Sequence, residues 1–316
     1  MRIFRNIQDC CDFRKPVVTI GTFDGVHRGH EVVLSALNDI ARNTGGESVV
    51  ITIWPHPRAV LQPEGGNIRI LSTLNEKVML LEQKGIDNLL VLPFTRELAS
   101  LSPEEFLRFY LVEKIKVRTL VVGFDHQFGK NREGDIAFLR YFAAQNSIDV
   151  YQPDAHLVDG QKVSSTLIRK LLEQGQVEQA NTFLGYVYPL TGKVTGGSRI
   201  GRTIGFPTAN IEPEDPLKLV PAGGVYAVTV LADGMWRQGM LNIGWRPTIN
   251  DNLLNQTIEV HIFDYDQDLY GKNLTLAFHF RLRDEMKFSN VQELKQQLER
   301  DAMHTRLLLA SVNMKQ

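Results

Sequence analysis

The residues with the clearest chemical meaning are two histidines that end a glycine-containing segment, Gly21-Thr22-Phe23-Asp24-Gly25-Val26-His27-Arg28-Gly29-His30. Glycines let a backbone approach an anion closely, and a helix that begins here offers free N–H groups and the positive end of its dipole. His27 and His30 are three residues apart on the opening turn, so both rings face one side. Such a pair can donate hydrogen bonds to a phosphate whose charge grows in a transition state. The alternatives are a glycine turn with capping histidines or a two-histidine metal site, and the combined pattern favours phosphate chemistry.

Two later segments can serve the same chemistry. Gly123-Phe124-Asp125-His126-Gln127-Phe128-Gly129-Lys130 follows a predicted strand, where a substrate loop or an ordinary connecting loop belongs. Ser164-Ser165-Thr166-Leu167-Ile168-Arg169 opens a helix predicted over 166–173. Hydroxyls at a helix start are first of all N-caps, but with Arg169 they can also hold the phosphates of a nucleotide.

In the second half, the candidate residues lie on predicted strands. Gly201-Arg202-Thr203-Ile204-Gly205-Phe206-Pro207-Thr208-Ala209-Asn210 is a glycine-flanked turn that runs into a strand, where Thr208 and Asn210 share a face. A hydroxyl and an amide oxygen side by side can coordinate Mg²⁺, although a polar strand start is the simpler interpretation. Glu259 shares a strand face with Thr257 and His261, either as a solvated carboxylate or as a base that takes a proton from a hydroxyl.

Two folds must position these residues. Apolar strands separated by helical patterns predict a doubly wound α/β domain with a parallel sheet, whose ligands bind at the carboxyl ends of the strands. Short strands separated by turn residues then predict a small antiparallel barrel or sandwich, closed by a helix with apolar residues from Val291 to Ala302. The boundary is expected near residue 185, giving domains 1–184 and 185–316. The expected strands are 17–20, 49–54, 89–92, 120–122 and 148–151 in the first domain, and about 187–195, 204–211, 225–231, 236–243, 257–263 and 273–281 in the second.

Composition limits the function classes. The 316 residues carry 35 basic and 36 acidic side chains, and the two predicted domains carry 21 against 22 and 14 against 14. Neither domain has the positive excess of a nucleic-acid or membrane surface, so no nucleic-acid or membrane partner is expected. Cys10 and Cys11 are adjacent and offer no disulfide framework, and no apolar run approaches the about 18 residues of a spanning helix. We therefore expect a reduced, cytoplasmic, soluble protein; whether it forms a homo-oligomer is open.

The three segments of the first domain, in this order, resemble the adenylyltransferase half of the prokaryotic bifunctional riboflavin kinase/FMN adenylyltransferase (FAD synthetase) family. That family shows G-x-F-D-G-x-H-x-G-H, a G-x-D-x-x-F-G loop and S-S-T-x-I-R, and Trp54-Pro55-His56-Pro57 matches its P-H-P segment. The resemblance implies a nucleotidyltransferase domain in which FMN phosphate attacks the α-phosphorus of ATP and pyrophosphate leaves. It also implies the following roles: His27 and His30 stabilise the transition state; Gly21, Phe23, Asp24, Gly25, Ser164, Thr166 and Arg169 bind ATP; Asp125 and Phe128 lie at the flavin.

The second domain resembles the riboflavin kinase half of the same family. Arg202 with 205–210 matches G-R-x-x-G-F-P-T-A-N, and Glu259-Val260-His261 follows in the family's order. The resemblance implies a six-stranded antiparallel barrel that transfers the γ-phosphate of ATP to the 5′-hydroxyl of riboflavin. Glu259 would be the base, Thr208 and Asn210 the ligands of Mg²⁺, and Gly201, Arg202, Gly205 and Pro207 part of the ATP site. The alternatives are an adenylyltransferase whose barrel only binds flavin as a sensor or store, and an RNA-binding nucleotidyltransferase, which the balanced charge disfavours.

Overall fold

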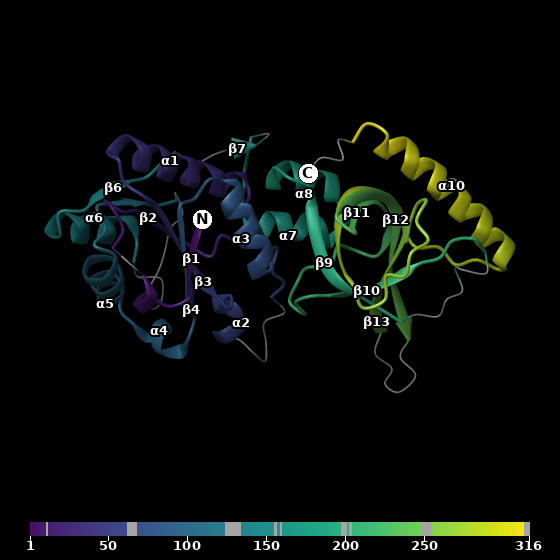
Figure 1. Ribbon diagram of the computed structural model, residues 1–316, viewed down its shortest axis with the longest axis horizontal. Coiled ribbons are helices and arrows are strands. Elements are labelled where there is room, and N and C mark those ends of the chain that lie inside the picture. The colour runs from purple at the N-terminus through teal and green to yellow at the C-terminus, as the bar shows by residue number, and fades with distance from the viewer. Residues whose placement is uncertain are drawn as a thin grey trace. The chain divides into compact units, whose positions relative to one another are not determined.

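The computed structural model describes residues 1–10, 12–61, 68–123, 134–154, 157–158, 160–196, 201, 204–247 and 254–312. The chain packs into two units, residues 1–165 and 166–316, each of which is described by itself (Figure 1). Within the described ranges, no helix is long and apolar enough to cross a membrane.

The first unit is built on a six-stranded sheet in which all neighbouring strands are parallel. The order β1-β4-β3-β2-β5-β6 runs away from β2 in both directions, so β2 lies at the topological switch point of the sheet. β1 has no counterpart among the predicted strands because its three residues are partly exposed and form no apolar run. The strands are β1 Arg2–Phe4, β2 Val17–Ile20, β3 Ser48–Trp54, β4 Asn88–Pro93, β5 Thr119–Val121 and β6 Asp149–Tyr151.

Helices cover both faces of this sheet because neighbouring strand residues point to opposite sides. Val17 packs with α1 and α3 in one apolar cluster, and Val18 packs with α5, the π-helix η2 and α6 in the other. The predicted doubly wound α/β domain is thereby confirmed. The helices are α1 Arg28–Thr44, α2 Pro57–Leu61, α3 Leu74–Gln83, α4 Arg96–Ser100, α5 Pro103–Phe106, η2 Leu107–Ile115 and α6 Ile136–Gln145, with a 3₁₀ turn η1 at Ile7–Asp9 and a small hairpin of β7 Leu157–Val158 and β8 Gln161–Lys162.

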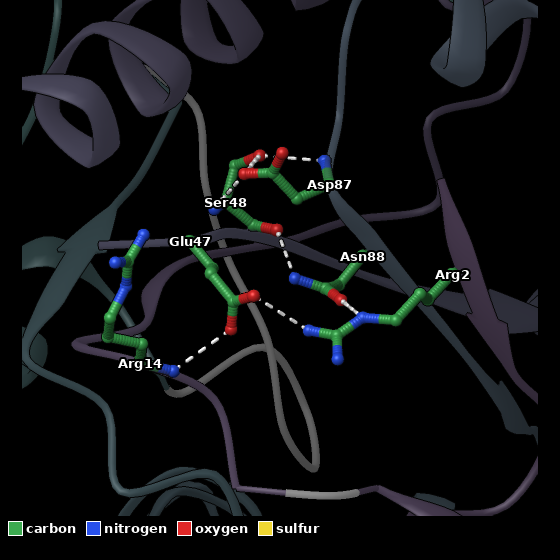
Figure 2. Close-up of polar contacts among 6 residues, drawn as sticks. All are labelled: Arg2, Arg14, Glu47, Ser48, Asp87 and Asn88. Carbon is green, nitrogen blue, oxygen red and sulfur yellow. Dashed lines mark hydrogen bonds and ion pairs between the residues drawn. The ribbon is translucent and has the colours of Figure 1, made fainter. Parts of the chain in front are cut away.

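A polar cluster ties together the amino ends of β1, β3 and β4 (Figure 2). The Ser48 hydroxyl donates to the Asp87 carboxylate and accepts from the Asp87 N–H, both at 2.9 Å. The Asn88 amide donates to the Ser48 carbonyl at 3.1 Å and accepts from Arg2 Nε at 2.8 Å. Arg2 also donates to Glu47 at 2.8 Å. These bonds satisfy groups that the sheet buries, so this edge has a structural role, and the carboxyl edge is left for ligands.

The second unit is a closed barrel with strand order β10-β13-β12-β11-β14-β9 and antiparallel pairing throughout. The β11–β12 turn uses Asp233 and Gly234, whose positive φ values of 49° and 76° fit a tight two-residue hairpin. The predicted six-stranded antiparallel barrel with a terminal helix is confirmed. The strands are β9 Tyr188–Thr195, β10 Ala209–Pro213, β11 Gly224–Ala232, β12 Met235–Pro247, β13 Leu254–Ile262 and β14 Asn273–Arg283, followed by α10 Val291–Leu309.

Two helices, α7 Ser165–Glu173 and α8 Val177–Leu184, precede the barrel. Asn181 of α8 donates to the Phe278 carbonyl at 2.8 Å and accepts from the Tyr188 N–H at 2.8 Å. The Ala222 N–H donates to the Leu172 carbonyl of α7 at 3.0 Å. By packing, therefore, the division of the chain falls after Ser165, while the composition of the sequence changes near residue 185.

Candidate active sites

The segment of residues 21–30, here called the histidine loop, joins β2 to α1 at the carboxyl end of β2. His27 is the N-cap of α1, and its Nδ1 accepts a hydrogen bond from the His30 N–H at 3.3 Å. The capping arrangement considered from the sequence is thus present. Because Nδ1 accepts, a neutral His27 ring carries its proton on Nε2, where it can donate.

The two histidine rings stack with centroids 3.7 Å apart and planes 13° from parallel. His30 also lies against Phe23, with centroids 5.1 Å apart. Burial lowers the pKa of His30 well below 6.5, and the charges of His27 and Lys77 lower it further. The buried Nδ1 of His30 has no hydrogen-bond partner among the described residues. An anion at this point would supply the missing partner and raise the pKa of His30.

The backbone of the histidine loop is strained. Phe23 and Val26 have φ values of 45° and 34°, which is a rare conformation for a β-branched residue such as Val26. Strain of this kind costs about 1–3 kcal/mol and persists only where the surroundings enforce it, most often at functional sites. The strain therefore marks the loop as a functional candidate, independently of the histidines.

Asp24 supplies that enforcement from inside the unit, where its side chain is buried. Its carboxylate accepts from the N–H groups of Leu71 and Ser72 at 3.0 and 3.1 Å, and from the Ser72 hydroxyl at 3.4 Å. The same hydroxyl accepts from the Gly25 N–H at 3.0 Å. The Ser165 hydroxyl donates to the Asp24 carbonyl at 2.9 Å. Asp24 thus faces away from solvent and fixes the shape of the loop.

Lys77 of α3 is a charged residue near the loop that the sequence patterns did not single out. Its side chain is buried, with Nζ 3.4 Å from Thr52 Oγ1 and 5.2 Å from the centroid of the Trp54 ring. Burial lowers the pKa of Lys77 to about 8, and the nearby Asp24 charge opposes that shift. In the sequence, a lysine within a helical pattern reads as part of a solvated face, so its burial becomes visible only in the tertiary structure.

The other residues named for the first site are placed only in part. Asp125 and Phe128 lie outside the described residues. Ser164 immediately precedes α7, and Thr166 and Arg169 lie on its first turns. Thr166 and Arg169 belong by packing to the second unit. Because the two units are not placed relative to each other, these two residues are not described as part of the site at the histidine loop.

In the barrel, the structure brings Thr208, Asn210 and Glu259 together. Asn210 of β10 lies opposite Glu259 of β13 in the strand register, and Glu259 lies opposite Asn242 of β12 on its other side. The Thr208 hydroxyl donates to the Glu259 carboxylate at 3.4 Å. Glu259 is only partly buried. A carboxylate, an amide oxygen and a hydroxyl on one patch form a set of hard oxygen ligands.

The turn before Thr208 is held by His261, a residue that the sequence placed on the same strand face as Glu259. His261 Nδ1 lies 2.7 Å from the Pro207 carbonyl, which can only accept, so Nδ1 carries the proton. Burial is the main cause that lowers the pKa of His261, which keeps the ring in this neutral form near pH 7. Gly205 has a φ of 85°, and a Cβ on Gly201 would collide with the Phe206 carbonyl. These glycines permit the turn; Arg202 lies outside the described residues.

Among the residues that the structure describes, no three His, Cys, Asp or Glu side chains gather into a metal cluster. Within these described residues, the two-histidine metal site considered for the histidine loop therefore gains no third His, Cys, Asp or Glu ligand. The first unit presents stacked imidazoles at a helix start, which suit an anion, and the barrel presents a carboxylate with neutral oxygen ligands, which suit a hard cation. Fold and sites together define a protein of two units, each with its own candidate site.

Comparisons with known proteins give the family. A model of the FAD synthetase family matches residues 11–167, and a model of the riboflavin kinase family matches residues 184–309. A bifunctional riboflavin kinase/FMN adenylyltransferase from Listeria monocytogenes is 37% identical over 94% of this chain and 93% of its own length. One from Escherichia coli (strain K12) is 36% identical over 92% of this chain and 91% of its own length.

The whole fold also has a solved counterpart. The crystal structure of a macrolide-efflux protein from Streptococcus pneumoniae is 31% identical, with a TM-score of 0.87 over 96% of this chain and 98% of that one. The chain belongs to the bifunctional riboflavin kinase/FMN adenylyltransferase family. It is a transferase with an FAD synthetase domain followed by a riboflavin kinase domain, as the resemblance of its motifs predicted.

Proposed function

We propose that this chain makes FAD from riboflavin in two steps, each of which consumes ATP. The barrel phosphorylates riboflavin to FMN, and the first unit adenylylates FMN. The observation that carries the proposal is that each matched family segment contains its own phosphate-handling group: His27 with His30 in one, and Glu259 with Thr208 and Asn210 in the other. A cytoplasmic location, where ATP is made available to both steps, belongs to the same proposal.

In the first unit, an oxygen of FMN phosphate attacks the α-phosphorus of ATP, the bond to the β-phosphate oxygen breaks, and pyrophosphate leaves. His27 and His30 donate to the α-phosphate oxygens as their negative charge grows, and the start of α1 adds its N–H groups and dipole. Gly21, Phe23 and Gly25 form the backbone cradle for ATP, and Asp24 holds its shape. No covalent enzyme intermediate is needed, so catalysis depends on positioning and electrostatics. Ser164, Thr166 and Arg169 are proposed to bind the triphosphate, and Asp125 and Phe128 to bind the flavin.

In the barrel, Glu259 takes the proton of the riboflavin 5′-hydroxyl while that oxygen attacks the γ-phosphorus of ATP, and ADP leaves. The Thr208 hydroxyl and Asn210 amide oxygen beside this carboxylate suit Mg²⁺, which prefers oxygen ligands. Bound there with ATP, Mg²⁺ would neutralise phosphate charge. His261 positions Pro207 and therefore Thr208, and Gly201, Arg202 and Gly205 shape the turn around ATP.

Two substitutions separate the two activities. Glu259→Gln keeps the size of the side chain but removes the base, so FMN formation should fall by about 100-fold or more while FAD formation from supplied FMN persists. His30→Ala should give the reverse, with FMN accumulating. Riboflavin, FMN and FAD are followed by chromatography in one incubation, and each variant is the control for the other.

Two results would contradict the proposal. If Glu259→Gln phosphorylated riboflavin at the wild-type rate, Glu259 would not be the base. If the wild type made no FMN from riboflavin and Mg²⁺-ATP, the barrel would be a flavin-binding module, as in the sensor alternative.

A further inference from the structure

Lys77 is an ammonium group with too few partners for its burial. An ammonium has three N–H donors, yet Nζ makes one hydrogen bond, of 3.4 Å, to Thr52 among the described residues. Its second contact is the face of the Trp54 ring at 5.2 Å. Nζ forms no ion pair with a carboxylate of the described residues, although Lys77 is only 2% exposed. Buried charges are normally paired, because desolvation makes an unpaired one costly.

The contacts of Lys77 link its charge to the histidine loop through Thr52. Thr52 and Trp54 belong to the carboxyl end of β3, next to β2 and its loop, and the Thr52 hydroxyl donates to the Thr22 carbonyl at 3.2 Å. The Lys77 charge is close enough to His30 to act on it electrostatically. The one carboxylate known to act on Lys77, that of Asp24, is already occupied by the Leu71 and Ser72 donors.

A second unpartnered group points to the same ligand. The buried Nδ1 of His30 has no hydrogen-bond partner among the described residues, and it comes from a different element, α1. Lys77 Nζ has no ion pair and His30 Nδ1 has no hydrogen bond among the described residues, and both groups lie at the histidine loop on the carboxyl edge of the sheet. Such a pair of groups is typical of a site that an anion completes.

We propose that Lys77 is a phosphate-binding catalytic residue of the adenylyl-transfer site, where its ammonium contacts an anionic oxygen of the phosphate chain and keeps His30 neutral until that anion is bound. The inference rests on the proposed function of the first unit and adds a residue to it. In the empty site, the Lys77 charge opposes protonation of His30. When phosphate binds, its negative charge favours the protonated forms of both groups, so the site gains positive charge when the transition state requires it.

The test compares Lys77, which lies within α3, with Lys84, which is the C-cap of the same helix. Lys77→Met keeps the aliphatic stem and removes the charge. Lys84→Met removes the same charge from a partly exposed ion pair with Glu31. Lys77→Met should lower kcat/KM for FAD formation from FMN and ATP by about 100-fold, and Lys84→Met should leave it unchanged. Riboflavin phosphorylation by the same samples should stay at the wild-type level, which shows that the second unit is intact.

Binding is measured separately with pyrophosphate, the leaving group of the proposed reaction. Trp54 lies beside Lys77, so its fluorescence in a full chain with Trp236→Phe and Trp245→Phe reports on this site. Pyrophosphate should shift this signal, and Lys77→Met should weaken its binding at least about tenfold. Unchanged affinity and unchanged kcat/KM in Lys77→Met would overturn the proposal and leave Lys77 a packing residue. Unchanged affinity with lost activity would also overturn it as a phosphate contact.

A pH profile keeps the proposal testable if Lys77→Met does not fold. In the wild type, kcat/KM for FAD formation should decline above about pH 8 as the ammonium of the free enzyme loses its proton. Lys77→Arg keeps the charge and should move that decline beyond pH 10, since guanidinium does not titrate there; an unmoved decline overturns the proposal. If the wild type bound pyrophosphate in a Lys77-dependent manner but made no FAD, the phosphate site would stand and the proposed reaction would fall.

Discussion

Asp24→Asn tests whether the fixed shape of the histidine loop supports catalysis. The substitution keeps the size of the side chain but replaces one carboxylate oxygen by a donor that faces the N–H groups of Leu71 and Ser72. Hydrogen bonds to a charged acceptor contribute about 1.5–3 kcal/mol each, and the asparagine oxygen can keep part of the set. We therefore expect the free energy of unfolding of the first unit to fall by about 3 kcal/mol.

Loss of these bonds should also affect the reaction. Val26 holds a strained conformation worth about 1–3 kcal/mol, so a loosened loop relaxes at that point and moves His27, which follows it directly. Small displacements of catalytic groups reduce rates by about 100-fold. FAD formation from FMN should fall by that factor, while riboflavin phosphorylation in the barrel should not change.

The assay must report on one unit, because two units need not unfold together. Trp54 is the tryptophan of the first unit, so urea titration in a Trp236→Phe/Trp245→Phe background follows that unit alone. Asp87→Asn is the matched control: Asp87 also accepts two hydrogen bonds, from Ser48 at 2.9 Å, but at the opposite edge of the sheet. It should lower stability and leave the activity of the folded protein intact. Wild-type FAD formation by Asp24→Asn would refute the reasoning.

Two further predictions concern the second unit. The Arg283 guanidinium donates to the Asp301 carboxylate of α10 at 2.6 and 3.1 Å. Asp301→Ala removes this carboxylate and should lower the free energy of unfolding of the second unit by about 3–5 kcal/mol in a urea titration. A loss below about 1 kcal/mol would contradict this prediction. Burial lowers the pKa of His279 from 6.5 to about 4, so between these pH values the unfolded chain binds the proton that the folded chain refuses, and stability should fall as pH falls. His279→Gln, which can still bond Thr229, should lose less thermal stability over that range, and an equal loss would exclude His279 as the cause.

The sequence anticipates elements whose periodicity is strong and misses those decided by long-range contacts. The strand at 17–20 and the histidine loop follow from an apolar run and from glycines next to histidines. The strand predicted over 204–211 instead begins at Ala209. Gly205 has a left-handed backbone conformation and Pro207 fixes its own φ, so the residues before Ala209 form a turn. Residues 103–115 form α5 followed by a π-helix, a change of hydrogen-bond spacing that an apolar pattern in the sequence does not signal.

The site shows the same limit. Local spacing favours a phosphate donor at His27 and offers a helix cap as the alternative, and the structure shows the capping bond. The inward direction of Asp24 and the burial of Lys77 depend on partners 47 and 25 residues away in the chain, so no local pattern reveals them. The composition shows only that both domains are nearly neutral, so any anion must be bound by a local group of residues.

The two units meet that demand in physically different ways. The first buries the Lys77 ammonium beside the His30 imidazole, which is neutral in the empty site, and this buried charge costs folding stability, as the lowered pKa of Lys77 indicates. The barrel presents a partly exposed carboxylate with neutral oxygen ligands, which costs less to fold and, in the proposed function, would bind phosphate through a cation brought with ATP. Removing the Lys77 charge should therefore lower activity and raise stability. We expect Lys77→Met to weaken FAD formation and to make the first unit about 3 kcal/mol more stable at pH 7, because a pKa shift from 10.5 to about 8 corresponds to about that free energy. A urea titration followed through Trp54 measures the gain, and a loss of stability instead would mean that the Lys77 ammonium stabilises the empty site.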